Sequence, residues 1–110
     1  MDYKATLFLS EDGSFPYKTV NVTCMYIEEI SKTDDKKNTS TITLYIDNRR
    51  NLIDKNIKAN NHNFMVREHN HTTINNSNDL RNFINNNQTY LIRKVESFKG
   101  NLSHIIISGS

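Results

Sequence analysis

The residues best suited to chemistry in this chain lie together in the run MVREHNHTT, which begins at Met65. Two of the four histidines, His69 and His71, stand there one residue apart beside Glu68. On a β-strand, residues so spaced project from one face, and a pair of imidazoles can bind zinc when a third ligand reaches them. Residues 68–78 are strongly polar, however, and such stretches are typical of loops with solvated histidines. We therefore predict a loop here and no metal site.

The letters EHNH, followed by NDL, resemble the opening of the motif of HNH nucleases. That motif requires a further metal ligand after a helix, and here Gln88, Thr89 and Tyr90 follow the run LRNFINNN instead. The chain also has no glycine-rich phosphate loop, since its three glycines are scattered. Its carboxylate pairs are adjacent residues, which face opposite ways on a strand. We expect no catalytic residues, no cofactor and no enzymatic activity.

The size and the cysteine content indicate a simple intracellular protein. A chain of 110 residues is the size of one domain, so we expect a single compact unit over residues 1–110. No apolar run approaches the length of a membrane span, and the first residues lack the features of a signal peptide. Cys24 is the only cysteine and lies in an apolar run, which predicts a buried, unreactive thiol. These features predict a cytoplasmic protein without membrane association.

The composition is biased toward residues with A/T-rich codons. Asparagine occurs 17 times, isoleucine 12 times and lysine 9 times, whereas alanine occurs twice and proline once. This pattern is typical of an AT-rich genome, such as that of a bacterium, its phage or plasmid, or a eukaryotic virus. We interpret much of the asparagine as a product of this codon bias.

Alternation of apolar and polar residues predicts the elements that must position these side chains. It indicates strands over residues 3–10, 17–30, 39–47, 64–67, 88–98 and 102–110, and helices over 48–60 and 77–87. Residues 31–40 contain no apolar side chain and predict a solvated loop. The first three strands should form an antiparallel meander. The result is an α+β domain, with a mainly antiparallel sheet of five or six strands and two short helices packed on one face.

Several finer expectations follow from the same patterns. In the second strand, Val20, Val22, Cys24 and Tyr26 should share one face. Ser77 or Asn78 should cap the second helix. The continuous apolar run 105–107 predicts a central strand covered on both faces.

The strongest functional signal is the distribution of charge. Residues 1–47 carry eight acidic and five basic side chains, a net charge of −3, whereas residues 48–110 carry four acidic and nine basic ones, a net charge of +5. A chain with this asymmetry can present a basic face to nucleic acid or to an acidic protein surface. Arginine and tyrosine are enriched at interface hot spots. We therefore predict contact with a partner through five residues, Arg49, Arg50, Tyr90, Arg93 and Lys94.

Taken together, the sequence predicts a small non-enzymatic interaction protein, encoded by a phage, plasmid or virus, that binds and blocks a protein partner. An inhibitor of a host defence or nucleic-acid-processing protein is one example. The first alternative is a nucleic-acid-binding accessory protein that uses the same basic residues. The second is a small structural virion component that self-associates through exposed strand edges.

Overall fold

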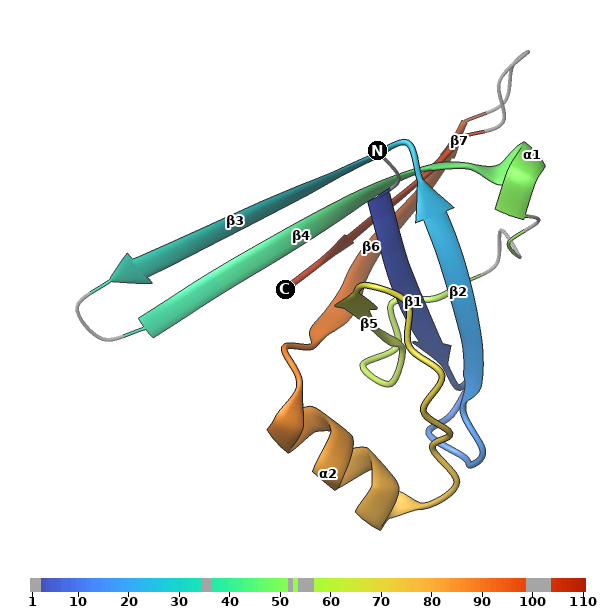
Figure 1. The fold of residues 1–110 in the computed structure, drawn as a ribbon, viewed down its shortest axis with the longest axis vertical. Helices are drawn as coiled ribbons and strands as arrows, with labels where there is room; N and C mark the ends of the chain where they lie inside the picture. Colours follow the sequence, from blue (N-terminus) through green and yellow to red (C-terminus); the bar gives the residue numbers. More distant parts are fainter. Residues whose placement is uncertain (1–2, 35–36, 52, 54–56, 99–103) are drawn as a thin grey trace.

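The computed structural model describes residues 3–34, 37–51, 53, 57–98 and 104–110. Seven strands and two helical segments follow one another along the chain (Figure 1). The elements are β1 (Tyr3–Leu9), β2 (Lys18–Cys24), β3 (Tyr26–Asp34), β4 (Lys37–Asp47), α1 (Asn48–Asn51), β5 (Phe64–Arg67), α2 (Ser77–Asn86), β6 (Tyr90–Phe98) and β7 (His104–Gly109).

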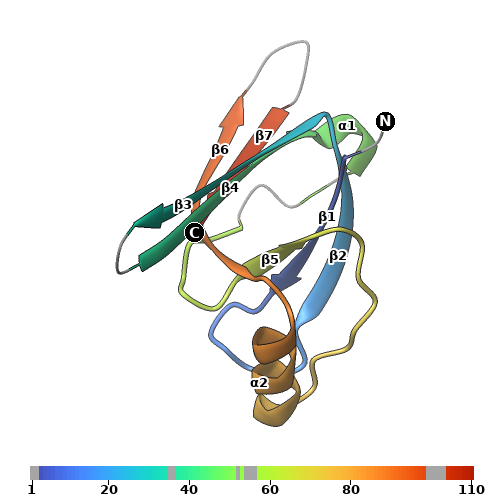
Figure 2. The ribbon, with the colours of Figure 1, turned by 60° about the vertical axis from the view of Figure 1, so that its left-hand side comes forward.

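All seven strands belong to one antiparallel sheet, in the order β2-β1-β5-β6-β7-β4-β3. β6 joins the two halves, because its first residues pair with β5 and the rest pair with β7. The sheet folds over on itself, so that β1, β2 and β5 run across the direction of the other strands (Figures 1 and 2). The prediction of an α+β domain with an antiparallel sheet is confirmed, with seven strands rather than five or six.

The main core lies between the two halves of the folded sheet. Alternate side chains of β1, β2 and β5 meet those of β4, β6 and β7 there, and the largest fully buried ones are aliphatic. On β4 the alternation is as expected, since Ile42, Leu44 and Ile46 are fully buried. Burial of each such side chain contributes about 1.5–3 kcal/mol relative to an exposed position.

A second, aromatic core lies on the opposite face of β1 and β5, under α2. The ring of Phe83 on α2 lies 4.8 Å from that of Phe8 and 5.9 Å from that of Phe64, measured between centroids. Asn76, rather than Ser77 or Asn78, caps this helix, because its Oδ1 accepts from the backbone N–H of Asp79 at 2.8 Å. α2 therefore covers the outer face of this half of the sheet only.

The predicted strand over residues 17–30 is broken at Met25, and this break removes the predicted meander. β2 pairs with β1, as expected of the first hairpin, but β3 pairs with β4 at the opposite edge of the sheet. Because one residue is inserted between the strands, the alternation changes phase, and Ile27 is buried in place of Tyr26. The backbone N–H of Met25 donates to the carbonyl of Tyr45, which fixes the corner.

Only one of the two predicted helices has the expected length. The described part of residues 48–60 contains the single helical turn α1 and then irregular chain. The side chain of Asn48 forms two hydrogen bonds with the backbone of Ile53, at 2.6 and 3.1 Å, and these compete with helical bonds. α1 lies at the end of β4, so the expectation of two helices packed on one face is wrong.

Two further expectations differ from the structure. Residues 31–34 and 37–40 are not a loop, because they continue β3 and β4 as a two-stranded ribbon; residues 35 and 36 lie outside the described part. β7 lies between β6 and β4, as a central strand should, but Ile106 is only partly buried while Ile105 and Ile107 are buried. No described element therefore covers the outer face of this half of the sheet.

Candidate functional site

The sequence singles out five residues for partner contact, and the structure describes the side chains of four of them, which do not form one cluster. Lys94 is exposed, and Arg93 is exposed beside the end of β7, where its Nε donates to Ser110 Oγ at 3.1 Å. Arg49 is exposed at the other end of the β4–β7 pair, where it binds Asp47 opposite His104. Ser110 lies six residues farther along, which is about 20 Å of strand. The side chain of Arg50 lies outside the described part of the chain.

Tyr90 belongs to the main core and not to the surface. Only 4% of it is exposed, and its hydroxyl donates to Glu29 Oε2 at 3.2 Å. Burial, followed by the nearby Glu29 charge and this hydrogen bond, raises the pKa of Tyr90 above its usual value. Glu29 also binds Arg67 Nε at 3.2 Å, so the three side chains join β3 to β5 and β6 across the core. Tyr90 therefore does not present its ring to a partner, contrary to the prediction from the sequence.

The charge asymmetry of the sequence is partly neutralised by folding. Arg67 from the basic half pairs with Glu29 from the acidic half, and Arg49 pairs with Asp47 at 2.9 Å. The hydrogen bond from Arg49 is the main reason why the pKa of Asp47 falls to about 2. Lys94 pairs with its neighbour Glu96 at 2.6 Å. Strands from the acidic half lie beside strands from the basic half, so these cations do not form a separate basic patch.

No described helix or loop covers the outer face of β3, β4, β7 and β6. The register places its side chains in rows across the strands, for example Tyr26, Tyr45, Ile106 and Glu96 in one row. Tyr26 is 49% exposed and Ile30 is 43% exposed, although both are large apolar side chains. We call this surface the open face; its members are Tyr26, Glu28, Ile30, Thr41, Thr43, Tyr45, Lys94, Glu96, Ile106 and Ser108.

Of the predicted contact residues, Lys94 lies on the open face, and Arg49 binds Asp47 at the end of β4, beside it. Sequence reasoning missed the apolar members, Tyr26 above all. Met25, Tyr26 and Ile27 are all apolar, so the alternation could not show which of them points outward. The structure resolves this through the corner at Met25.

The run that follows β5 is a loop, as predicted, and its histidines contact β2. His69 Nε2 donates to the carbonyl of Val22 at 3.0 Å, and the side chain of Asn21 lies 3.4 Å from Nδ1 of His71. The described residues contain no group of three or more histidine, cysteine, aspartate or glutamate side chains placed to hold a metal ion. The two histidines therefore have a structural use, since they hold the loop on β2.

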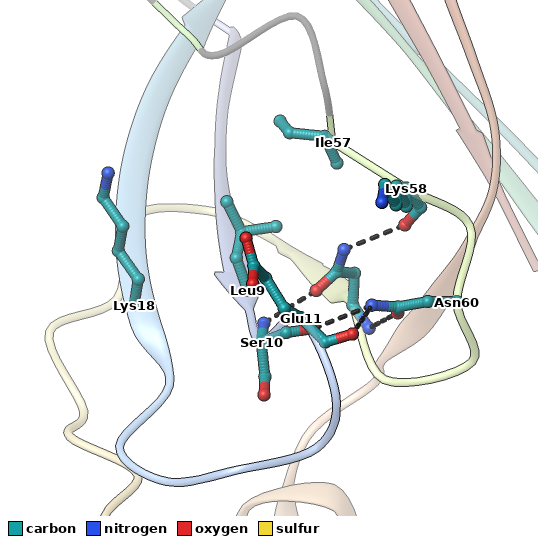
Figure 3. A pocket seen from close by; sticks show the side chains of 8 residues that line it. Leu9, Ser10, Glu11, Lys18, Ile57, Lys58 and Asn60 are labelled. Atoms are coloured by element: carbon teal, nitrogen blue, oxygen red, sulfur yellow. Dashed lines mark hydrogen bonds between the residues drawn. The ribbon is translucent and has the colours of Figure 1, made fainter.

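A cavity of about 260 Å³ opens between the end of β1 and the segment before β5 (Figure 3). Two of its polar side chains, Asn60 and Asn63, are engaged with the protein itself. Asn60 Nδ2 donates to the carbonyls of Ser10 and Glu11, and the buried Asn63 accepts from Ser10 N–H at 2.7 Å and donates to the carbonyl of Lys58 at 2.8 Å. These two amides hold loops together and have little capacity left for a ligand.

The thiol of Cys24 is buried in the main core, as predicted. Burial raises its pKa to about 12, so almost no thiolate is present near neutral pH.

No helix in the described part of the chain is both long and apolar enough to cross a membrane. No protein-family model matches this chain, and neither a curated protein nor a solved structure is similar enough to it to indicate a family.

Proposed function

We propose that this protein is a small non-enzymatic interaction protein, encoded by a phage, plasmid or virus, that binds a protein partner and blocks it. The single observation that carries the proposal is the open face, where exposed tyrosine and isoleucine side chains stand among charged ones. Interface cores are enriched in aromatic side chains and are surrounded by a polar rim. Tyr26 and Ile30 would form the centre of such an interface, with Lys94 and Arg49 at its margin.

The charges favour a protein partner over nucleic acid. Binding to phosphates requires several cations that are free to replace counterions. Arg49, Arg67 and Lys94 are each held by a carboxylate, and the formal net charge of the chain is only +2. A mixed surface of this kind is suited to steering a protein with complementary charges.

The test is capture of the partner from a cell extract, identification by mass spectrometry, and measurement of its Kd with purified protein. We expect the double change Ile30→Ser and Lys94→Ala to weaken the complex by about 1–3 kcal/mol, which is the range for interface hot spots. Ile84→Ser is the matched control, because Ile84 is 45% exposed but lies on α2, away from the open face. The control should bind like the unmodified protein.

Two outcomes would contradict the proposal. If recovery from the extract is abolished by nuclease, and the log of the affinity falls with the log of the salt concentration at about −0.9 per phosphate contact, the protein binds nucleic acid. If Ile84→Ser weakens the protein complex as much as the double change does, the open face is not the contact surface. Once a partner is identified, competition with that partner's own ligand tests whether binding of this protein blocks the partner.

A further inference from the structure

The edge strand β3 presents an unpaired backbone beside the open face. It pairs with β4 in unbroken register from Tyr26 to Asp34, and no described strand pairs with its other side. β7 accompanies β4 only from Ile42 onward, so the outer part of the β3–β4 hairpin is two-stranded and projects from the body (Figures 1 and 2). Such ribbons are marginally stable alone, and a bare edge is a template for a further strand.

The opposite edge of the sheet, formed by β2, is contacted by a loop. β2 also has one strand neighbour, but the loop after β5 crosses it. His69 donates a hydrogen bond to the carbonyl of Val22. The side-chain oxygen of Asn21 accepts from the hydroxyl of Thr6 and from the backbone N–H of Asn70. These contacts hinder a further strand from pairing with β2. On β3, the ring of Tyr26 lies 5.4 Å from that of Tyr3, between centroids, and Glu29 pairs with Arg67, but no described loop or helix lies over its edge. Strand addition is therefore directed to β3.

The side chains beside the free edge define the chemistry of the strand that would fit. Tyr26, Glu28 and Ile30 alternate along β3 on the open face. The carboxylate of Glu28 is exposed and forms no ion pair with a described residue. Residues directly opposite each other on neighbouring strands stabilise the pair when both are apolar or when their charges are opposite. The complementary pattern is apolar, basic, apolar at every second residue.

A second copy of this chain matches the edge only in part. The symmetric register with Ile30 opposite Ile30 places Lys32 opposite Glu28, but it sets Asp34 opposite Tyr26. Only one symmetric antiparallel register brings Tyr26 of one copy opposite Ile30 of the other. That register also places the Glu28 carboxylates of the two copies directly opposite each other, which is destabilising. A strand from a different protein, with a basic residue at this position, avoids the repulsion.

We propose that the partner contributes an extended segment that adds to the sheet at β3, with a lysine or arginine opposite Glu28 and apolar side chains against Tyr26 and Ile30. This proposal rests on the proposed function, since it specifies how the open face and the neighbouring edge of β3 bind a protein partner. Main-chain hydrogen bonds supply affinity in this binding mode, and the alternate side chains supply specificity.

The experiment uses synthetic peptides and the intact protein labelled with ¹⁵N. The probe is the capped peptide TVTRTVT, and the charge-reversed control is TVTETVT. Amide chemical shifts of the protein should move along β3, between Tyr26 and Ile30, with the arginine peptide. The arginine peptide should bind about three- to fivefold more tightly than the glutamate peptide, as expected of one cross-strand charge pair. Glu28→Lys should reverse this preference.

Methylation of the peptide backbone separates strand pairing from side-chain contact. Two versions of TVTRTVT are made, each methylated on one of the two alternate sets of N–H groups. One of them should lose binding, because its hydrogen bonds to β3 are blocked. Unchanged binding of both versions, equal binding of the two charge forms, or shifts that avoid β3 would overturn strand addition.

The peptide assay needs no natural partner, so its failure is distinct from failure of the proposed function. A partner that is captured and lost with Ile30→Ser and Lys94→Ala, while the peptides leave β3 unchanged, would show docking on the open face without an added strand. Shifts of the β3 amides on raising the concentration of the protein alone, together with a dimer in sedimentation, would assign the edge to a second copy and overturn the proposal.

Discussion

Replacement of Asn63 by alanine should destabilise the fold by about 2–3 kcal/mol. Asn63 is 5% exposed, and its side chain joins the end of β1 to the segment before β5. The change leaves the N–H of Ser10, which lies in a buried position, without its partner at 2.7 Å, at a cost of about 1–3 kcal/mol. The carbonyl of Lys58 lies on an exposed residue and can turn to water, so its share is smaller.

Urea unfolding followed by circular dichroism measures this difference in the free energy of unfolding. Asn85→Ala is the control, because Asn85 is exposed on α2 and its change should stay within about 0.5 kcal/mol. An Asn63→Ala variant as stable as the control would refute the assignment of Asn63 as a buried link between two loops.

Asn63→Asp tests the donor side of the same amide, because an ionised carboxylate cannot donate to the carbonyl of Lys58. The neutral acid can donate, so the pKa of the new carboxyl should lie above its ordinary value in the folded protein. Because the pKa of this carboxyl is raised in the folded state, the loss of stability relative to the unmodified protein is smallest below the ordinary pKa of about 3.9. The deficit in unfolding free energy should grow from pH 4 to pH 7, and a deficit that shrinks over this interval would contradict the reasoning.

Three further predictions concern single side chains. The thiol of Cys24 should react with a disulfide reagent at pH 8 far more slowly in the folded protein than after unfolding in urea, because burial raises its pKa from 9.0 to about 12. The pKa of Asp47 falls from 3.8 to about 2, so its contribution to stability is present above about pH 4 and is lost as the pH falls toward 2. Asp47→Asn should therefore reduce the change in melting temperature between pH 4 and pH 2. His69→Ala should cost about 0.5–1.5 kcal/mol in urea unfolding, because it removes the bond to Val22; an unchanged stability would show that the loop is held by other contacts.

Alternation along the chain was sufficient to predict most strands, because one face of each is buried and the other is not. It predicted β5 at Phe64–Arg67 and the buried residues of β4. It could not predict the break at Met25, since three apolar residues in succession fit either phase. The order of strands also depends on contacts between distant residues, such as the pairing of Ala5 with Arg67, which no local pattern encodes.

The asparagines show why composition was a poor guide to part of the fold. We attributed much of their abundance to codon bias, yet Asn48, Asn63 and Asn76 each bond to backbone groups that would otherwise lack a partner. An asparagine that replaces a backbone partner looks the same in the sequence as one that faces water. Of the candidate contact surface, Lys94 and Arg49 were predictable from charge, whereas the exposure of Tyr26 and the burial of Tyr90 required the folded sheet.

The corner at Met25 has a consequence for how the chain reaches its fold. One residue connects β2 and β3, which occupy the two outermost positions of a seven-stranded sheet. Neither hairpin can take its final place until β5, β6 and β7, from later in the chain, have been inserted between them. Assembly therefore waits on pairings across long sequence separations, which slow folding in small domains. We expect the hairpins β1–β2 and β3–β4 to form early. The strands β5, β6 and β7 should then complete the sheet in the rate-limiting step.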